Sequence, residues 1–201
     1  MIGALTLPPT GIYTSPGVAG LYATDSVFSV FSLTSDTNWV FAGLTTFASQ
    51  FVGRTARLYF RYRNGNSGSS FQGDFAIDYI RLPNGIVYNE DFSTYQYSTI
   101  NTSLISSAAS STWNNIGTTV SSTGGRWNLR SGGTPSSNTG PSGAKSGTYY
   151  LYAETSSPTA FNQYMWLRSP SVTITNNNYL FHYNAYGACV GQIYVYVVLE
   201  D

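Results

Sequence analysis

The sequence predicts an all-β protein, an antiparallel β-sandwich or jelly roll with little or no helix. Aromatic residues make up 16% of the 201 residues, and 17 tyrosines stand beside 20 glycines and many serines, threonines and asparagines. Tyrosine and threonine favour pleated, half-buried surfaces, whereas glycine, asparagine and serine favour turns. Strong helix formers are scarce, with one lysine and three glutamates. Several short runs also alternate with period two between turn signals.

The first clear strand is predicted at residues 56–63. Its alternation places Arg57, Arg61 and Arg63, together with Tyr59, on one face and apolar side chains on the other. The run stops at Asn64 in a sequence rich in glycine and asparagine. A second run begins at Phe75 and stops at Pro83. The turn residues between the two runs predict that they are neighbouring antiparallel strands.

The second half of the chain has the same pattern. Strands are predicted at residues 149–154, 165–167, 179–183 and 192–199. Turns rich in glycine and serine separate them, which is typical of a sandwich or jelly roll. The polar stretch at residues 98–125 is predicted to be a long connection, ordered or poorly packed.

Charge and cysteine content exclude several classes of partner. Nine basic residues balance nine acidic ones, and only 9% of the residues are charged, so the basic stripe that nucleic-acid binding requires is missing. No apolar run is long enough to span a bilayer, and the N-terminus lacks the pattern of a secretory signal. The single cysteine, Cys189, excludes an internal disulfide and is interpreted as a small buried hydrophobe.

The sequence offers little for catalysis, so we expect no enzymatic activity, cofactor or metal. A glycosidase needs two carboxylates that face each other across a sugar site. Asp74 and Asp78 share a strand face and form the best such pair, but their expected roles are turn capping and strand-end hydrogen bonding. His182 is the only histidine and lies within an apolar run, where a structural role is expected. One histidine and one cysteine cannot form a usual zinc site.

From Arg126 onward the sequence resembles the opening half of a MAM domain. The resemblance rests on an acidic-Phe start at 90–92 and on runs at 126–129, 134–136, 139–141, 147–150, 154–156, 167–170, 181–183, 186–187 and 191–195. Residues 30–82 resemble the closing half, with Trp39 before a strand that ends at Phe51 and a terminal run at 73–80. The resemblance implies a β-sandwich jelly roll that mediates adhesion and self-association, with no catalysis.

The two halves stand in reversed order. The chain is therefore expected to form one sandwich over residues 1–201, circularly permuted, with halves 1–82 and 92–201 joined by 83–91. Two alternatives remain open: two half-domains completed by neighbouring copies, or a window cut from a tandem array.

Binding is the expected role. Trp113, Trp127 and Trp166 are candidates for stacking on sugar rings, although Trp39, Trp127 and Trp166 are interpreted first as core residues. The face with Arg57, Arg61 and Arg63 is interpreted as a solvated sheet face, or alternatively as an interface. Low charge, absent disulfides and the resemblance together predict a structural protein on the surface of a virus particle, most simply a bacteriophage capsid decoration, knob, fibre or tail-fibre module. Its expected partners are other virion proteins and its own copies. The alternative is a carbohydrate-binding or host-cell adhesion module for surface glycans.

Overall fold

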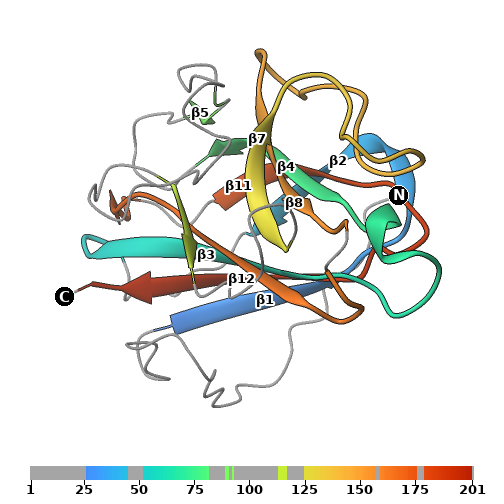
Figure 1. Cartoon of the computed structure of the whole chain (residues 1–201). Coiled ribbons are helices and arrows are strands. Elements are labelled where there is room, and N and C mark those ends of the chain that lie inside the picture. The colour runs from blue at the N-terminus through green and yellow to red at the C-terminus, as the bar shows by residue number, and fades with distance from the viewer. Residues whose placement is uncertain are drawn as a thin grey trace.

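Antiparallel strands form two sheets that pack face to face (Figure 1). This computed structural model describes residues 26–44, 52–81, 89–90, 92, 113–116, 125–156, 159–175 and 179–200. Its only helix within these ranges is a short 3-10 turn, η2 (Ser70–Gln72). The predicted all-β sandwich is therefore confirmed.

The first sheet, called here the β3 sheet, forms the lower layer in Figure 1. Its strands run in the order β1 (Ser26–Ser32), β12 (Gln192–Leu199), β3 (Thr55–Arg63), β9 (Tyr164–Arg168) and β6 (Asn114–Ile116), and β10 (Val172–Thr173) also pairs with β3. The second sheet, called the β4 sheet, lies above it. Its order is β2 (Asp36–Leu44), β11 (Tyr179–Ala185), β4 (Phe75–Arg81), β8 (Tyr150–Glu154) and β7 (Arg126–Arg130), and β5 (Asn89–Glu90) also pairs with β4.

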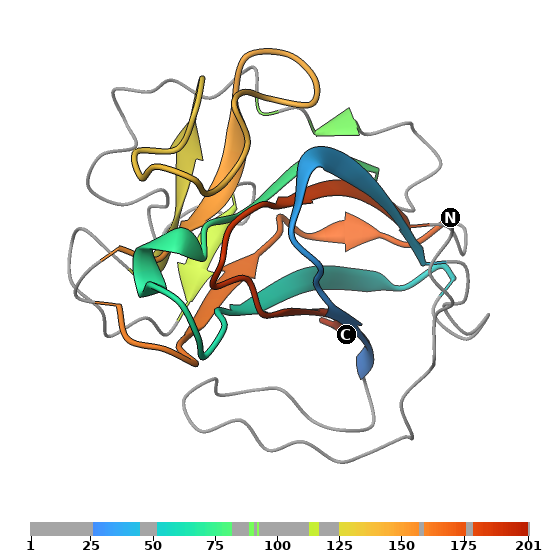
Figure 2. The same ribbon diagram turned by 90° about the vertical axis from the view of Figure 1, so that its right-hand side faces the viewer.

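Every strand predicted from alternation is present, within a residue or two at its ends. The expected antiparallel neighbourhood of residues 56–63 and 75–82 is wrong, because β3 and β4 belong to different sheets. The residues between them do not form a hairpin; they cross from one layer to the other at the end of the sandwich (Figure 2). Turn residues indicate where a strand stops, but they do not distinguish a hairpin from a crossing between sheets.

The two sequence halves pair with each other inside one chain. Strand β3 lies between β12 and β9, and β4 lies between β11 and β8. Each central strand from the first half is thus flanked on both sides by strands from the second half. Most of the expected join, residues 83–91, lies outside the described residues, as does most of the stretch 98–125.

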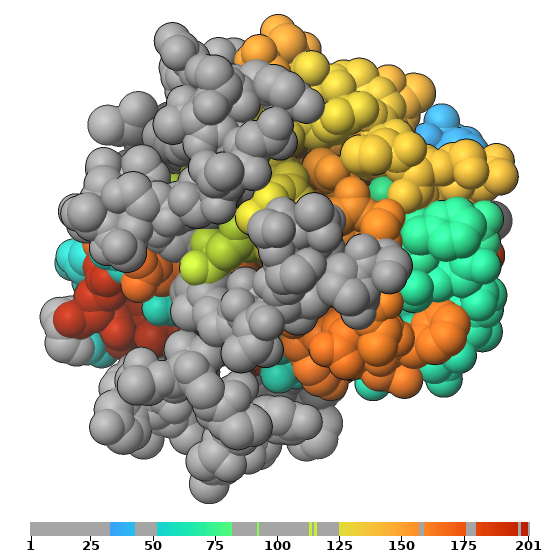
Figure 3. All heavy atoms as spheres, viewed as in Figure 1, coloured from blue at the N-terminus to red at the C-terminus, as the bar shows by residue number. Residues whose placement is uncertain are grey.

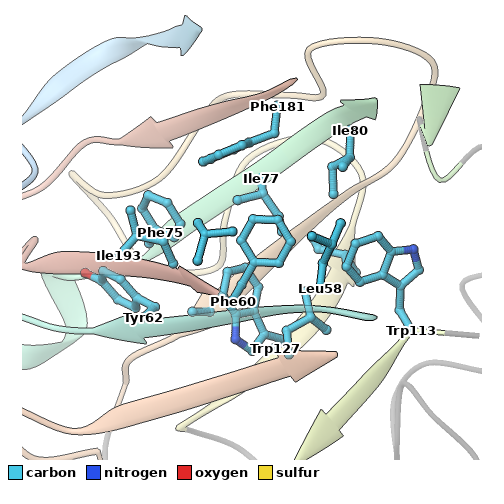
Figure 4. Packing of buried hydrophobic residues seen from close by; sticks show 14 of the residues in the cluster. Leu58, Phe60, Tyr62, Phe75, Ile77, Ile80, Trp113, Trp127, Phe181 and Ile193 are labelled. Carbon is cyan, nitrogen blue, oxygen red and sulfur yellow. The ribbon is translucent and has the colours of Figure 1, made fainter. Parts of the chain in front are cut away.

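The core lies between the sheets and is rich in aromatic rings (Figure 4). Tyr62 stacks on Phe75 with ring centroids 4.8 Å apart, and Phe60 meets Phe181 edge to face at 5.4 Å. Trp127 is fully buried and donates its indole N–H to the Met165 carbonyl at 3.1 Å. These contacts join strands of the two sheets directly.

Loops of distant sequence meet at one end of the sandwich. Residues 64–74 lie beside residues 159–163 (Figure 3), where Asn64 Nδ2 donates to the Ala160 carbonyl at 2.9 Å. Cys189 joins the same end through its backbone, since its N–H donates to Gln72 O at 3.0 Å. Gly187 has φ +145°, and a Cβ there would lie 2.1 Å from Gln72 O, so only glycine fits this close approach.

Candidate interaction surface

The outer face of the β3 sheet carries arginine and aromatic side chains on three adjacent strands. The register places Arg61 opposite Tyr194 of β12 and Trp166 of β9. Arg63 likewise lies opposite Tyr164 of β9. Because side chains of directly paired residues point to the same side of a sheet, these residues share one face.

Arg61 is at the centre of this face. Its guanidinium carbon lies 4.6, 5.1, 4.1 and 5.5 Å from the ring centroids of Tyr164, Trp166, Tyr194 and Tyr196. Cation–π attraction at these distances stabilises the arginine, and the flat guanidinium suits stacking better than an ammonium group. We call Tyr59, Arg61, Tyr164, Trp166, Tyr194 and Tyr196 the Arg–aromatic cluster.

The centre of the cluster is buried, whereas its margin is exposed to solvent. Arg61 is 5% exposed, Trp166 6% and Tyr196 8%. Tyr164 is 39% exposed, and its ring lies 6.4 Å from that of Tyr194, centroid to centroid. The accessible part of the cluster is therefore an aromatic edge held in place by a buried cation.

Polar contacts fix the arginines on either side. Arg57 donates to the Glu200 carboxylate, and its Nη1 donates to Ser169 O at 3.1 Å. Arg63 Nη2 donates to Gln192 Oε1 at 2.6 Å, and the Tyr194 hydroxyl donates to the same oxygen at 2.8 Å. These bonds restrict the rotamers of the side chains that border the cluster.

The structure brings together the three arginines that the sequence grouped. The interpretation of this face as solvated is wrong for Arg57 and Arg61, which are 8% and 5% exposed. Long side chains bury their stems and charges here because aromatic rings and Glu200 surround them. The sequence placed Tyr59 on this face but missed the tyrosines that β9 and β12 contribute to the cluster. Their signal was the same period-two spacing, at 164 and 166 and at 194 and 196.

Trp113 is not at a surface, and its assignment as a binding residue is corrected here. It is fully buried, with its ring 6.0 Å from Phe60 and 5.8 Å from Phe92. Figure 4 shows its indole beside Leu58 in the interior. A ring enclosed on all sides cannot stack on a sugar. Trp127 is equally buried, so only Trp166 of the three stacking candidates lies on an outer face.

The outer face of the β4 sheet is covered in part by residues 131–149, called the β7–β8 loop. The Trp39 indole N–H donates to Gly143 O at 3.0 Å. Asp78 Oδ2 accepts the backbone N–H groups of Lys145 and Ser146 at 2.7 and 3.0 Å. The loop thus lies over Trp39 and the tyrosines of β8. Trp39 is therefore an outer-face residue, and not a core residue as expected.

Asp74 and Asp78 make structural hydrogen bonds, as the sequence suggested. Asp74 is fully buried and accepts from the Thr155 N–H and hydroxyl at 3.1 and 3.2 Å. Burial and the nearby Glu154 charge raise the pKa of Asp74 to about 8. Neither aspartate faces an open cavity in the described part of the chain, since each is 0% exposed.

His182 and Cys189 occupy structural positions. The His182 ring lies 5.4 Å from Phe41 and 5.7 Å from Tyr79, and burial with the nearby Lys145 charge lowers its pKa. Cys189 is a buried free thiol whose pKa burial raises. Among the described residues, no three acids, histidines or cysteines are grouped to hold a metal ion.

No helix in the described ranges has the length and apolar character needed to cross a membrane. No protein-family model matches the chain, and no solved structure matches it at a significant level.

Proposed function

We propose that this protein is a structural, non-enzymatic component of a virus particle surface and that the Arg–aromatic cluster is its contact surface. The cluster carries the proposal. Tryptophan, tyrosine and arginine are the residues that contribute most at protein interfaces, and the outer face of an antiparallel sandwich is normally polar. A bacteriophage capsid decoration, knob, fibre or tail-fibre module fits this role.

Composition supports the same role. With 9% charged residues and a formal net charge of zero, electrostatic repulsion between copies is weak. The single cysteine means that stability comes from burial and hydrogen bonds, which suits a protein made in a reducing cytoplasm. Many copies on one particle would let weak contacts act together.

The reversed MAM-like halves are part of the proposal. We infer that the chain is a circular permutant of an adhesion-type sandwich, closed within one molecule. The pairing of β3 with β12 and β9 supports closure, because the first half alone would expose the apolar side of both sheets. Copies that exchange halves would give the same strand pairs at a higher mass.

A carbohydrate-binding or adhesion module is the second candidate, and the exposed Tyr164 favours it. An accessible tyrosine ring beside Tyr194 offers a surface on which a sugar ring could stack. The same residues would then contact a glycan on a host surface.

Light scattering with a glycan array separates the two functions. We expect the mass of one chain at micromolar concentration, reversible association as concentration rises, and no signal on the array. Tyr164→Ser should weaken association, whereas Phe41→Ser, which removes a 57% exposed ring from the other sheet, should not. Specific glycan binding lost in Tyr164→Ser, without self-association, would establish the second candidate instead.

A further inference from the structure

Two buried acids lie opposite each other at the loop end of the β4 sheet. Phe75 pairs with Ala153 and Ala76 with Tyr152, so the same register, continued by one residue, places Asp74 opposite Glu154. Asp74 is 0% exposed and Glu154 5%. Like charges directly opposite on neighbouring strands repel, and burial strengthens the repulsion.

The hydrogen bonds of Asp74 match a neutral carboxyl group. Oδ1 accepts both bonds from Thr155, whereas Oδ2 is buried and has no hydrogen-bond partner within the described residues. A buried carboxylate oxygen without a donor is costly. A proton on Oδ2 removes the charge, and with it the repulsion from Glu154.

The other titratable groups around the pair keep one charge state near neutral pH. Burial raises the pKa values of Tyr62, Tyr150 and Tyr152, which stay protonated. The Tyr152 hydroxyl donates to Glu154 Oε2 at 3.0 Å, and Arg126 pairs with Glu154 in the β7–β8 register. Glu154 Oε2 therefore has a hydrogen-bond donor, which Asp74 Oδ2 lacks.

Cys189 lies at this end of the sheet, whereas Arg130 lies at the other end of β7, opposite Tyr150. The charge of Arg130 acts on Tyr150 and Tyr152. Burial raises the pKa of the Cys189 thiol, so it stays protonated near neutral pH. His182 lies under the far part of the loop, near Lys145, and its lowered pKa places its titration in acid.

The β7–β8 loop closes over the Asp74 carboxyl group. The Asp74 N–H donates to Thr139 Oγ1 at 2.9 Å, and the Thr134 hydroxyl, which adjoins the Asp74 carboxyl, donates to Thr139 O at 2.8 Å. Gly140 N–H fixes the next residue by donating to Tyr186 O at 2.8 Å. Separate hydrogen bonds at scattered residues hold this loop, whereas ladders of backbone bonds hold the strands beneath it. Opening the loop is therefore the least costly way to hydrate an ionised Asp74.

We propose that the proton on Asp74 latches the β7–β8 loop onto the sandwich, and that losing this proton in mild alkali opens the loop while both sheets stay folded. This device goes beyond the proposed function and does not depend on it. The direction of its pH dependence follows from the linkage between proton binding and loop closure. A closed-state pKa raised above the value of an exposed aspartate means that closure is most favourable in acid, weakens through neutral pH, and stops weakening above about pH 8.

Hydrogen exchange on the whole chain between pH 6.5 and 9 tests the latch. We expect the protection factors of the Gly140, Lys145 and Ser146 amides to fall about tenfold per pH unit up to about pH 8 and then to level off. The amide of Val195, in the centre of the β3 sheet, should keep its protection. Asp74→Asn supplies a neutral side chain of the same shape, so the loop amides should stay protected throughout.

Two further measurements complete the test. Glu154→Gln removes the opposing charge and lowers the closed-state pKa of Asp74, so the fall in loop protection should level off at lower pH and be smaller at pH 8. If Asp74→Asn fails to fold, Glu154→Gln still tests the proposal, because an unchanged pH profile of its loop protection would contradict the latch. A rise in loop protection at pH 8 on adding calcium chloride would mean that the acids hold a cation and would overturn the proposal, as would loop and Val195 amides that lose protection together.

Discussion

The outer faces of the two sheets both carry aromatic side chains, but these side chains have different contacts on each face. On the β4 sheet, the polar tips of Trp39 and Tyr150 donate to backbone carbonyls of the β7–β8 loop. On the β3 sheet, the rings surround the side chain of Arg61. The first face is covered in part by the chain's own backbone, beside which Phe41 stays exposed. The second is stabilised from within the strands and keeps an exposed margin at Tyr164.

The comparison teaches that aromatic content alone does not identify a binding face. A tyrosine or tryptophan whose polar tip is bonded to a covering loop is part of the structure. A ring held by a neighbouring cation, with one side accessible, is preorganised for contact and loses little conformational freedom when a partner binds. The proposed function depends on this difference.

The largest expected effect concerns the core tryptophan that the sequence suggested as a binding residue. Trp113→Ala should lower the free energy of unfolding by about 3–5 kcal/mol, because it leaves a cavity beside Phe60 and Phe92. Denaturant unfolding followed by circular dichroism measures the loss. Trp166→Ala, from the Arg–aromatic cluster, should cost less. A Trp113→Ala protein with unchanged stability would show that Trp113 does not belong to the core.

A smaller effect is expected where the β7–β8 loop is attached. Asp78→Asn keeps the shape of the side chain but cannot accept the Lys145 and Ser146 N–H groups as well as a carboxylate does. The free energy of unfolding should fall by about 1–3 kcal/mol. Exchange of those two amides should accelerate, and Trp39 fluorescence should shift to longer wavelength as the indole meets water. Arg63→Gln, on the opposite sheet, is the control and should leave the loop amides unchanged.

The smallest effect is expected at the centre of the Arg–aromatic cluster. Arg61→Lys keeps the charge but loses the flat group that lies against the rings, so stability should fall by about 1 kcal/mol. Thermal unfolding measures this loss of stability, with Arg130→Lys on β7 as the control at a half-buried arginine. Equal effects of the two substitutions would contradict a specific role for the rings around Arg61.

The alternation of residue types was enough to predict the central strands, because successive side chains of a strand point to opposite faces of its sheet. It could not find β1 or assign β2 its true position, since residues 26–44 lack a clear alternation and pair only through the tertiary fold. Nor could it place β3 and β4 in different sheets, because sheet membership depends on the long-range pairing with β12 and β11.

The site was partly predictable for the same reason. Arg57, Arg61 and Arg63 were grouped correctly by spacing along one strand. Their burial depends on Trp166 and Tyr194, which are distant in sequence and meet Arg61 only through register. Trp113 was misplaced because it directly precedes β6, a strand too short for a two-residue period to show which side chains are buried. The opposition of Asp74 and Glu154 likewise follows only from the register of β4 with β8.

Hydroxyl-radical footprinting of the dilute and the associated protein tests the central claim most directly. Tyr164 and Phe41 report on the two outer faces, with exposed fractions of 39% and 57% in the single chain. We predict that association protects Tyr164 several-fold and leaves the oxidation rate of Phe41 unchanged. Protection of Phe41 with an unchanged rate at Tyr164 would show that the contact surface lies on the β4 sheet and would contradict the account.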